Sequence, residues 1–163
     1  MGKDKRNGTK YIALSGIIAA LYIALSLISM AFGISYGPVQ VRFSEALCIL
    51  PVFLPAAIPG LTIGCLLSNL IMGCALWDVI FGTLATLLGA LGTYYLRKKP
   101  LLALVPPIVA NTIIVPLILR YAYSTNLPLW VLMISVGAGE IISAGVLGRI
   151  LYLGIKKSGM KFE

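Results

Sequence analysis

The stretch YIALSGIIAALYIALSLISMAF, residues 11–32, contains no charged side chain. A helix needs roughly 20 apolar residues to cross the hydrocarbon core of a membrane, and this stretch is long enough. It is also too long for the apolar region of an ordinary signal peptide, and no clear small-residue cleavage site follows it. We therefore interpret it as a retained transmembrane helix, preceded by a basic segment with Lys3, Lys5, Arg6 and Lys10.

The composition extends this interpretation to the whole chain. Of 163 residues, 60% are hydrophobic and only 11% are charged, with a mean hydropathy of +1.00. Soluble domains carry about 25% charged residues, so the composition predicts an all-α integral membrane protein. We expect one membrane domain over residues 11–155 with basic tails at 1–10 and 156–163. Its six transmembrane helices are expected at 11–32, 43–56, 59–73, 78–96, 101–122 and 128–154.

The basic residues are distributed unevenly along this predicted bundle. With six crossings both termini lie on one side, and the loops 33–42, 73–78 and 122–128 lie on the other. The second side holds only Arg42 and Arg120. The excess of Lys and Arg predicts that both termini are cytoplasmic and that the three loops face outward. The basic residues assigned to the terminal side are Lys3, Lys5, Arg6, Lys10, Arg97, Lys98, Lys99, Lys156, Lys157 and Lys161.

Several function classes are disfavoured by what the sequence lacks. It contains no histidine, no CxxC pair, no cluster of acids for a metal and no Walker A motif. Without histidine no Ser-His pair can form, so we expect no enzyme, no cofactor and no metal site. The net charge of +8 gathers at the ends of apolar runs, which is typical of membrane topology rather than of nucleic-acid binding.

Five polar residues interrupt the apolar segments and are candidates for a binding site. Ionisable groups at membrane depth are costly and usually functional. Each has a structural alternative: Asp78 could cap a helix, Glu45 could pair with Arg42, and the others could hydrogen-bond between helices. Because most fall in the predicted outer half, we expect a shared outward-facing cavity. The five are Glu45, Asn69, Asp78, Asn111 and Glu140.

Two further patterns allow two interpretations each. The outward loops read SYGPVQVRF, GCALWD and YAYSTNLPLW, and their aromatic side chains could form an interfacial belt or contact a ligand. Small residues recur at four-residue spacing at Gly16, Ala20 and Ala24, which suits either a subunit interface or packing within the bundle.

Six short helices, the Ala20–Ala24 pair and the segments VQVRFSEAL and ALWDVIFGTLATLLG together resemble the S components of energy-coupling-factor transporters. Within that group the chain is similar to the QueT family, assigned to queuosine precursors. The resemblance covers nearly the whole chain and is most specific over 39–54 and 76–90. It implies an S component that binds substrate from outside and topples in the membrane. A shared transmembrane subunit, packed on Ala20 and Ala24, and two cytoplasmic ATPases would drive transport.

The implied ligand is a 7-deazaguanine, such as queuine or its aminomethyl precursor. A carboxylate, Glu140 or Glu45, would accept its N1–H and 2-amino group. Donors for the base would come from Asn111, Asn69 or Arg42, and Asp78 would pair with an amine on the 7-substituent. The aromatic candidates for stacking on the base are Trp77, Tyr36, Phe43 and Trp130.

Three other functions remain open from the residues. The chain could be an S component for another vitamin-like solute, or a structural assembly subunit. It could also be a proton-coupled small-solute transporter in which Glu140 carries the proton.

Overall fold

The computed structural model describes residues 2–35 and 40–159, with side chains from residue 8 onward. Its regular structure is helical throughout these ranges. The α-helices are α1 (Gly2–Ala31), α2 (Ala57–Ile71), α3 (Thr83–Tyr95), α4 (Val105–Tyr121), α5 (Leu129–Glu140) and α6 (Gly148–Lys157). Two 3₁₀ segments, η1 (Phe43–Val52) and η3 (Leu102–Leu104), and two π-helical segments, η2 (Asp78–Gly82) and η4 (Ile141–Leu147), complete the described elements.

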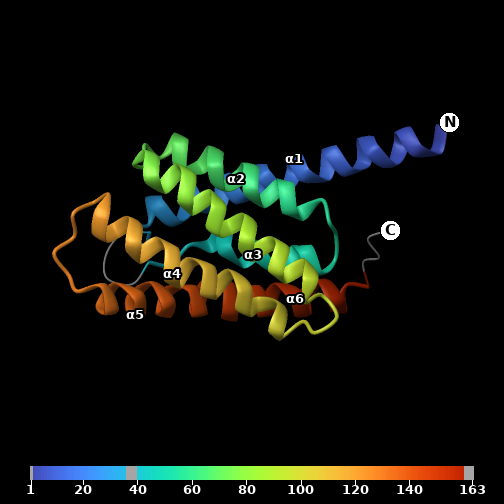
Figure 1. The fold of residues 1–163 in the computed structure, drawn as a ribbon. Coiled ribbons are helices and arrows are strands. Elements are labelled where there is room, and N and C mark those ends of the chain that lie inside the picture. Colours follow the sequence, from blue (N-terminus) through green and yellow to red (C-terminus); the bar gives the residue numbers. More distant parts are fainter. Residues whose placement is uncertain (1, 36–39, 160–163) are drawn as a thin grey trace.

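The helices lie side by side in one bundle, and their connections gather at its two ends (Figure 1). The described ends of the chain and the connection from α3 to α4 lie at one end, which we call the terminal end. The connections from α2 to α3 and from α4 to α5 lie at the other, which we call the loop end. Within the part of the chain that the structure describes, three helical stretches are long and apolar enough to cross a membrane: Gly8–Ala31, Leu102–Tyr121 and Leu129–Lys157.

The observed boundaries differ from the expected ones at both tails and in the second helix. Residues 2–10, expected as a basic tail, continue the helix α1, and α6 ends at Lys157, within the expected tail 156–163. The second expected helix, 43–56, is instead a 3₁₀ helix that ends at Val52. Proline has no N–H to donate and disturbs an α-helix, and here Pro51 lies within the last turn and Pro55 closely follows it. The shortened helix leaves the following turn to reverse the chain into α2.

Glycines allow the closest helix contacts in the bundle. On α2, a Cβ atom at Gly60 would lie 2.8 Å from the carbonyl oxygen of Ser15, and one at Gly64 would lie 2.7 Å from the Cβ of Tyr22. Both distances are too short for a real side chain, so α1 and α2 can approach this closely only because these positions are glycine. This contact places the side chain of Tyr22, which is 1% exposed, in the interior of the bundle.

The terminal end carries arginines that contact aromatic rings. The guanidinium carbon of Arg97 lies 4.1 Å from the ring centroid of Tyr94. The guanidinium carbon of Arg149, in α6, lies 5.6 Å from the ring centroid of Tyr152. Arginine on aromatic rings is favourable at a membrane interface, where rings and cations anchor a helix end.

Candidate functional site

A cavity of about 440 Å³ opens at the loop end of the bundle. Its volume falls in the range of about 300–1,000 Å³ that is usual for small-molecule sites. All three connections that the charge pattern placed on one side contribute to its wall, together with α1, α4 and α5. The described lining residues are Ser26, Ser35, Gln40, Arg42, Met72, Cys74, Asp78, Val115, Ile118, Leu119, Tyr123, Thr125, Leu127, Leu132, Ser135 and Val136.

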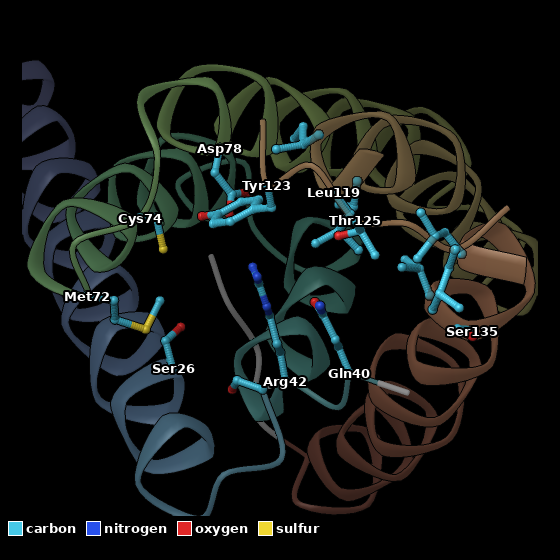
Figure 2. A pocket seen from close by; sticks show the side chains of 16 residues that line it. Ser26, Gln40, Arg42, Met72, Cys74, Asp78, Leu119, Tyr123, Thr125 and Ser135 are labelled. Carbon is cyan, nitrogen blue, oxygen red and sulfur yellow. The ribbon is translucent and has the colours of Figure 1, made fainter. Parts of the chain in front are cut away.

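Asp78 and Tyr123 form one wall of this cavity (Figure 2). The Tyr123 hydroxyl donates a hydrogen bond to Oδ2 of Asp78 at 3.1 Å and accepts one from the backbone N–H of Ala75 at 3.0 Å. The phenol therefore links the connection after α4 to the connection after α2. Burial, reinforced by the neighbouring Asp78 carboxylate, raises the pKa of Tyr123 to about 12, so the hydroxyl keeps its proton at physiological pH.

The π-helical segment η2 places Asp78 at this wall. Asp78 is its first residue and is 6% exposed. Asn69 of α2 supports the segment, because its Nδ2 donates a hydrogen bond to the Asp78 carbonyl oxygen at 3.3 Å. Asn69 therefore stabilises the backbone at Asp78 and does not itself line the cavity. The Asp78 side chain accepts its hydrogen bond from Tyr123, and no described contact makes it a helix cap.

Arg42 reaches into the cavity from the segment that precedes η1. Figure 2 shows its side chain, with Gln40 beside it, extended toward the wall formed by Asp78 and Tyr123. Burial lowers the pKa of Arg42, but the nearby Asp78 carboxylate, together with Tyr22 and Glu45, outweighs it, so the pKa is raised and the guanidinium stays protonated. The cavity thus holds a cation and a carboxylate from different elements, which can contact different parts of one polar ligand.

Glu45 lies deeper and its carboxylate is already satisfied. It is 2% exposed and accepts a short hydrogen bond from the Tyr22 hydroxyl. Its Oε2 accepts hydrogen bonds from the Cys48 thiol at 3.1 Å and from Nδ2 of Asn111 at 3.4 Å. Three donors compensate the burial of this charge, so the described partners of Glu45 come from the bundle and not from Arg42.

Glu140 presents the opposite case. It is 7% exposed, and its Oε2 is buried without a hydrogen-bond partner among the described residues. A buried polar atom without a partner is uncommon and calls for an explanation. Glu140 lines a small pocket of about 10 Å³, roughly the space of one water molecule, that adjoins the main cavity. The two spaces share the lining residues Gln40, Arg42, Val115 and Val136.

The structure brings some of the residues predicted from the sequence together and separates others. Arg42 and Asp78 line the main cavity, and the adjoining pocket is lined by Glu45, Asn111 and Glu140. The aromatic candidates lie elsewhere. Trp77 is 59% exposed and stacks on Phe81 with ring centroids 5.7 Å apart; Trp130 is 66% exposed; Phe43 is half-buried and does not line either space; Tyr36 lies outside the described residues.

Sequence reasoning did not single out several lining residues. Tyr123 is the one aromatic side chain among the described lining residues, and it lies in the quoted segment YAYSTNLPLW. Tyr121, two positions earlier, is 77% exposed. Tyr121 is the last residue of α4, whereas Tyr123 lies in the connection that turns over the cavity, and the sequence does not show this path. The other polar or sulfur-bearing residues that were not singled out are Ser26, Ser35, Gln40, Met72, Cys74, Thr125 and Ser135.

The small residues of α1 lie on its outer surface. Gly16, Ala20 and Ala24 are all exposed, and no atom outside its own helix comes within 4 Å of a Cβ built at Gly16. The packing against α2 uses a different face of α1, which includes Ser15 and Tyr22. Among the described residues, then, this small-residue ribbon does not serve packing within the bundle.

Two comparisons with known proteins lead to the same family. A family model described as QueT transporter matches residues 12–157. The curated "Queuosine precursor transporter QueT" of Lactococcus lactis subsp. cremoris (strain MG1363) is 42% identical over 84 residues, which cover 51% of this chain and 48% of that protein. The chain thus spans about half the length of the curated relative that it matches. No solved structure matches.

Proposed function

The chain belongs to the QueT transporter family, and on that basis we propose that it is the substrate-binding S component of an energy-coupling-factor importer for a queuosine precursor. Family membership and the apolar helices make it a multi-pass protein of the cell membrane. The ligand is a 7-deazaguanine, either queuine or its aminomethyl precursor. The relative from L. lactis, whose name refers to a queuosine precursor, supports this ligand class.

The observation that carries the proposal is the combination of polar groups around the cavity and the small pocket that adjoins it. Arg42 and Asp78 line the cavity, and Glu140 adjoins it with an oxygen that has no described partner. A guanine-type edge presents N1–H and the 2-amino group side by side, and one carboxylate accepts both. Glu45 is committed to three donors, so Glu140 is the acceptor for this edge.

The remaining groups match the rest of the ligand. The Arg42 guanidinium donates to the carbonyl oxygen of the base, which is an acceptor without a proton. Asp78 pairs with the amine of the 7-substituent, which is cationic at neutral pH. Tyr123 closes the wall beside Asp78 and offers a flat apolar surface at the mouth of the cavity.

The S-component role also needs partner subunits. The exposed ribbon of Gly16, Ala20 and Ala24 on α1 provides a surface on which a second helix can pack closely. We assign it to the shared transmembrane subunit, which works with two cytoplasmic ATPases. The ligand is captured at the loop end and released when the chain topples in the membrane.

A second candidate is supported by the same unpartnered oxygen. A buried carboxyl with one oxygen that has no described partner is also what a proton-coupled transporter would place in its pathway, with Glu140 as the carrier. Reconstitution distinguishes the two functions. The S-component proposal predicts uptake of a labelled 7-deazaguanine into vesicles only with the partner subunits and ATP. Uptake by this chain alone, driven by an imposed pH gradient and lost in Glu140→Gln, would reject it.

A further inference from the structure

Two serine hydroxyls hold the backbone of the segment that carries Arg42 into the cavity. The N–H of Arg42 donates to Oγ of Ser143 at 3.1 Å, and the N–H of Phe43 donates to Oγ of Ser29 at 2.8 Å. Ser29 belongs to α1 and Ser143 to the π-helical segment η4. Successive amides of one short segment are therefore bonded to two helices that are far apart in the sequence.

The amides of Arg42 and Phe43 precede or begin the helix η1 and have no partner within it, whereas the neighbouring Val41 N–H donates to the Ile34 carbonyl at 2.9 Å. Arg42 is extended, with φ −118° and ψ 112°, and it immediately precedes η1. An unsatisfied backbone N–H in an apolar surrounding is strongly unfavourable. Both serines are buried, Ser29 at 0% and Ser143 at 1% exposure. Ser29 also donates its own proton to the Leu25 carbonyl at 2.9 Å, so its lone pairs are free to face the Phe43 amide.

A glycine on α5 lets the same segment lie close to that helix. A Cβ at Gly139 would overlap the carbonyl group of Gln40, so the backbone of residue 40 can cross α5 only where no side chain stands. The segment is thus fixed at Gln40 by contact and at Arg42 and Phe43 by hydrogen bonds. The two residues of this segment whose side chains enter the cavity, Gln40 and Arg42, are thus both held through their backbone (Figure 2).

We propose that Ser29 and Ser143 are positioning residues that set the location of the Arg42 guanidinium in the cavity. They do not line the described cavity themselves, so they act on a ligand through Arg42. The inference rests on the proposed function, in which Arg42 contacts the ligand. It adds that the affinity for the ligand depends on two hydroxyls outside the binding surface.

The test compares ligand affinity in single and combined variants of the purified full-length chain. We expect Ser143→Ala and Ser29→Ala each to weaken binding of 7-aminomethyl-7-deazaguanine about three- to tenfold, the effect of one hydrogen bond. In an Arg42→Ala background the same serine changes should have no further effect on the dissociation constant. Should an alanine variant fail to fold, Ser143→Cys or Ser29→Cys keeps the side-chain size with a much weaker acceptor.

Ser15→Ala is the matched control. Ser15 is another buried serine of α1, and its hydroxyl is bonded to the carbonyl groups of Tyr11 and Ala56, away from the cavity. The Ser15→Ala substitution should lower thermal stability without changing the affinity for 7-aminomethyl-7-deazaguanine. Normal affinity in the Ser29 and Ser143 variants, or equal losses with and without Arg42, would overturn the inference. Normal affinity in Arg42→Ala would instead reject the assignment of Arg42 in the proposed function.

Discussion

At the scale of single residues, two buried carboxylates close to one another have different roles. Glu45 is satisfied by a phenol, a thiol and an amide, and these contacts connect η1 to α1 and α4. Glu140 keeps an oxygen that no described group satisfies, at the pocket that adjoins the cavity. A buried acceptor without a partner is stabilised when a ligand donates to it, so Glu140 gains most from binding.

Glu140→Gln tests this difference. The change replaces a charged double acceptor with an amide that can accept at only one atom, so we expect affinity for a 7-deazaguanine to fall by about tenfold, or about 1.4 kcal/mol. Equilibrium dialysis of the purified variant measures the change. The comparison is Glu45→Gln, which should mainly lower the melting temperature because it disturbs three internal hydrogen bonds. Unchanged affinity in Glu140→Gln would remove this residue from the site.

Tyr123→Phe tests the link between the two connections at the cavity wall. Removing the hydroxyl deletes its hydrogen bonds to Ala75 and Asp78. Because the side chain is half-exposed, we expect the free energy of unfolding to fall by only about 0.5–1 kcal/mol. The pKa of Tyr123 is raised, so this contribution is present below pH 10, the ordinary tyrosine value, and is lost as pH rises toward 12. Thermal melts should therefore separate wild type from variant at pH 8 and converge near pH 12.

The exposed Tyr121→Phe is the matched control for this comparison and should melt like wild type at both pH values. A difference between wild type and Tyr123→Phe that persists at pH 12 would contradict the proposed hydrogen bonds.

Residue types and depths could be predicted from the sequence better than side-chain directions. The three acids and Asn111 line two adjoining spaces, whereas Asn69 lies behind the cavity wall. Trp77 and Trp130, expected near the ligand, are exposed instead. The sequence indicates the level of these two rings in the bundle, but level alone does not fix the face of the helix on which a side chain lies.

At the scale of elements, α1 has two faces with different tasks. One face packs closely on α2 at Gly60 and Gly64. The same face holds Tyr22, which is hydrogen-bonded to Glu45, and Ser29, which is hydrogen-bonded to the Phe43 amide. The ribbon of Gly16, Ala20 and Ala24 is exposed. A four-residue spacing of small side chains fits either task, so the sequence could not decide between them. The structure distinguishes the two tasks, because Gly60 and Gly64 of α2 pack against the other face of α1 and leave the ribbon exposed.

Ala20→Leu combined with Ala24→Leu tests the assignment of this ribbon. Two larger side chains should block the approach of the shared transmembrane subunit while leaving the cavity unchanged. We expect the double variant to bind the ligand like wild type but to fail to copurify with the partner subunits. Loss of ligand binding, with or without assembly, would place the ribbon inside the functional core of this chain instead.

At the scale of the whole molecule, the excess of basic residues and the cavity lie at opposite ends. Arg97 and the basic residues of α6 lie toward the terminal end, whereas the cavity is formed by the connections at the loop end (Figure 1). The helix η1 has ten residues, of which seven are buried. At about 2.0 Å per residue it spans about 20 Å, less than a hydrocarbon core of about 30 Å. It therefore belongs to the interior of the bundle, around which the longer helices face lipid.

Cys74 provides a test of the proposed orientation with a native residue. It is a partly exposed lining residue at the loop end, whereas Cys48 and Cys65 are buried. Burial, and secondarily Asp78, raises the pKa of the Cys74 thiol, so labelling should be slow at pH 7 and faster at pH 9. A membrane-impermeant maleimide should modify intact cells at Cys74, and Cys74→Ser should abolish the signal. If Cys74 is labelled only in permeabilised cells, the loop end faces the cytoplasm and the proposed orientation is wrong.

The central claim is that this chain alone captures a queuosine precursor in the cavity at its loop end. Isothermal titration of the purified, folded chain with 7-aminomethyl-7-deazaguanine tests it most directly, with guanine and unrelated vitamins as competitors. The account predicts saturable binding of one ligand per chain without ATP or other subunits, and a marked loss of affinity in Arg42→Ala. Absence of binding by any 7-deazaguanine, together with saturable binding of another vitamin, would contradict it.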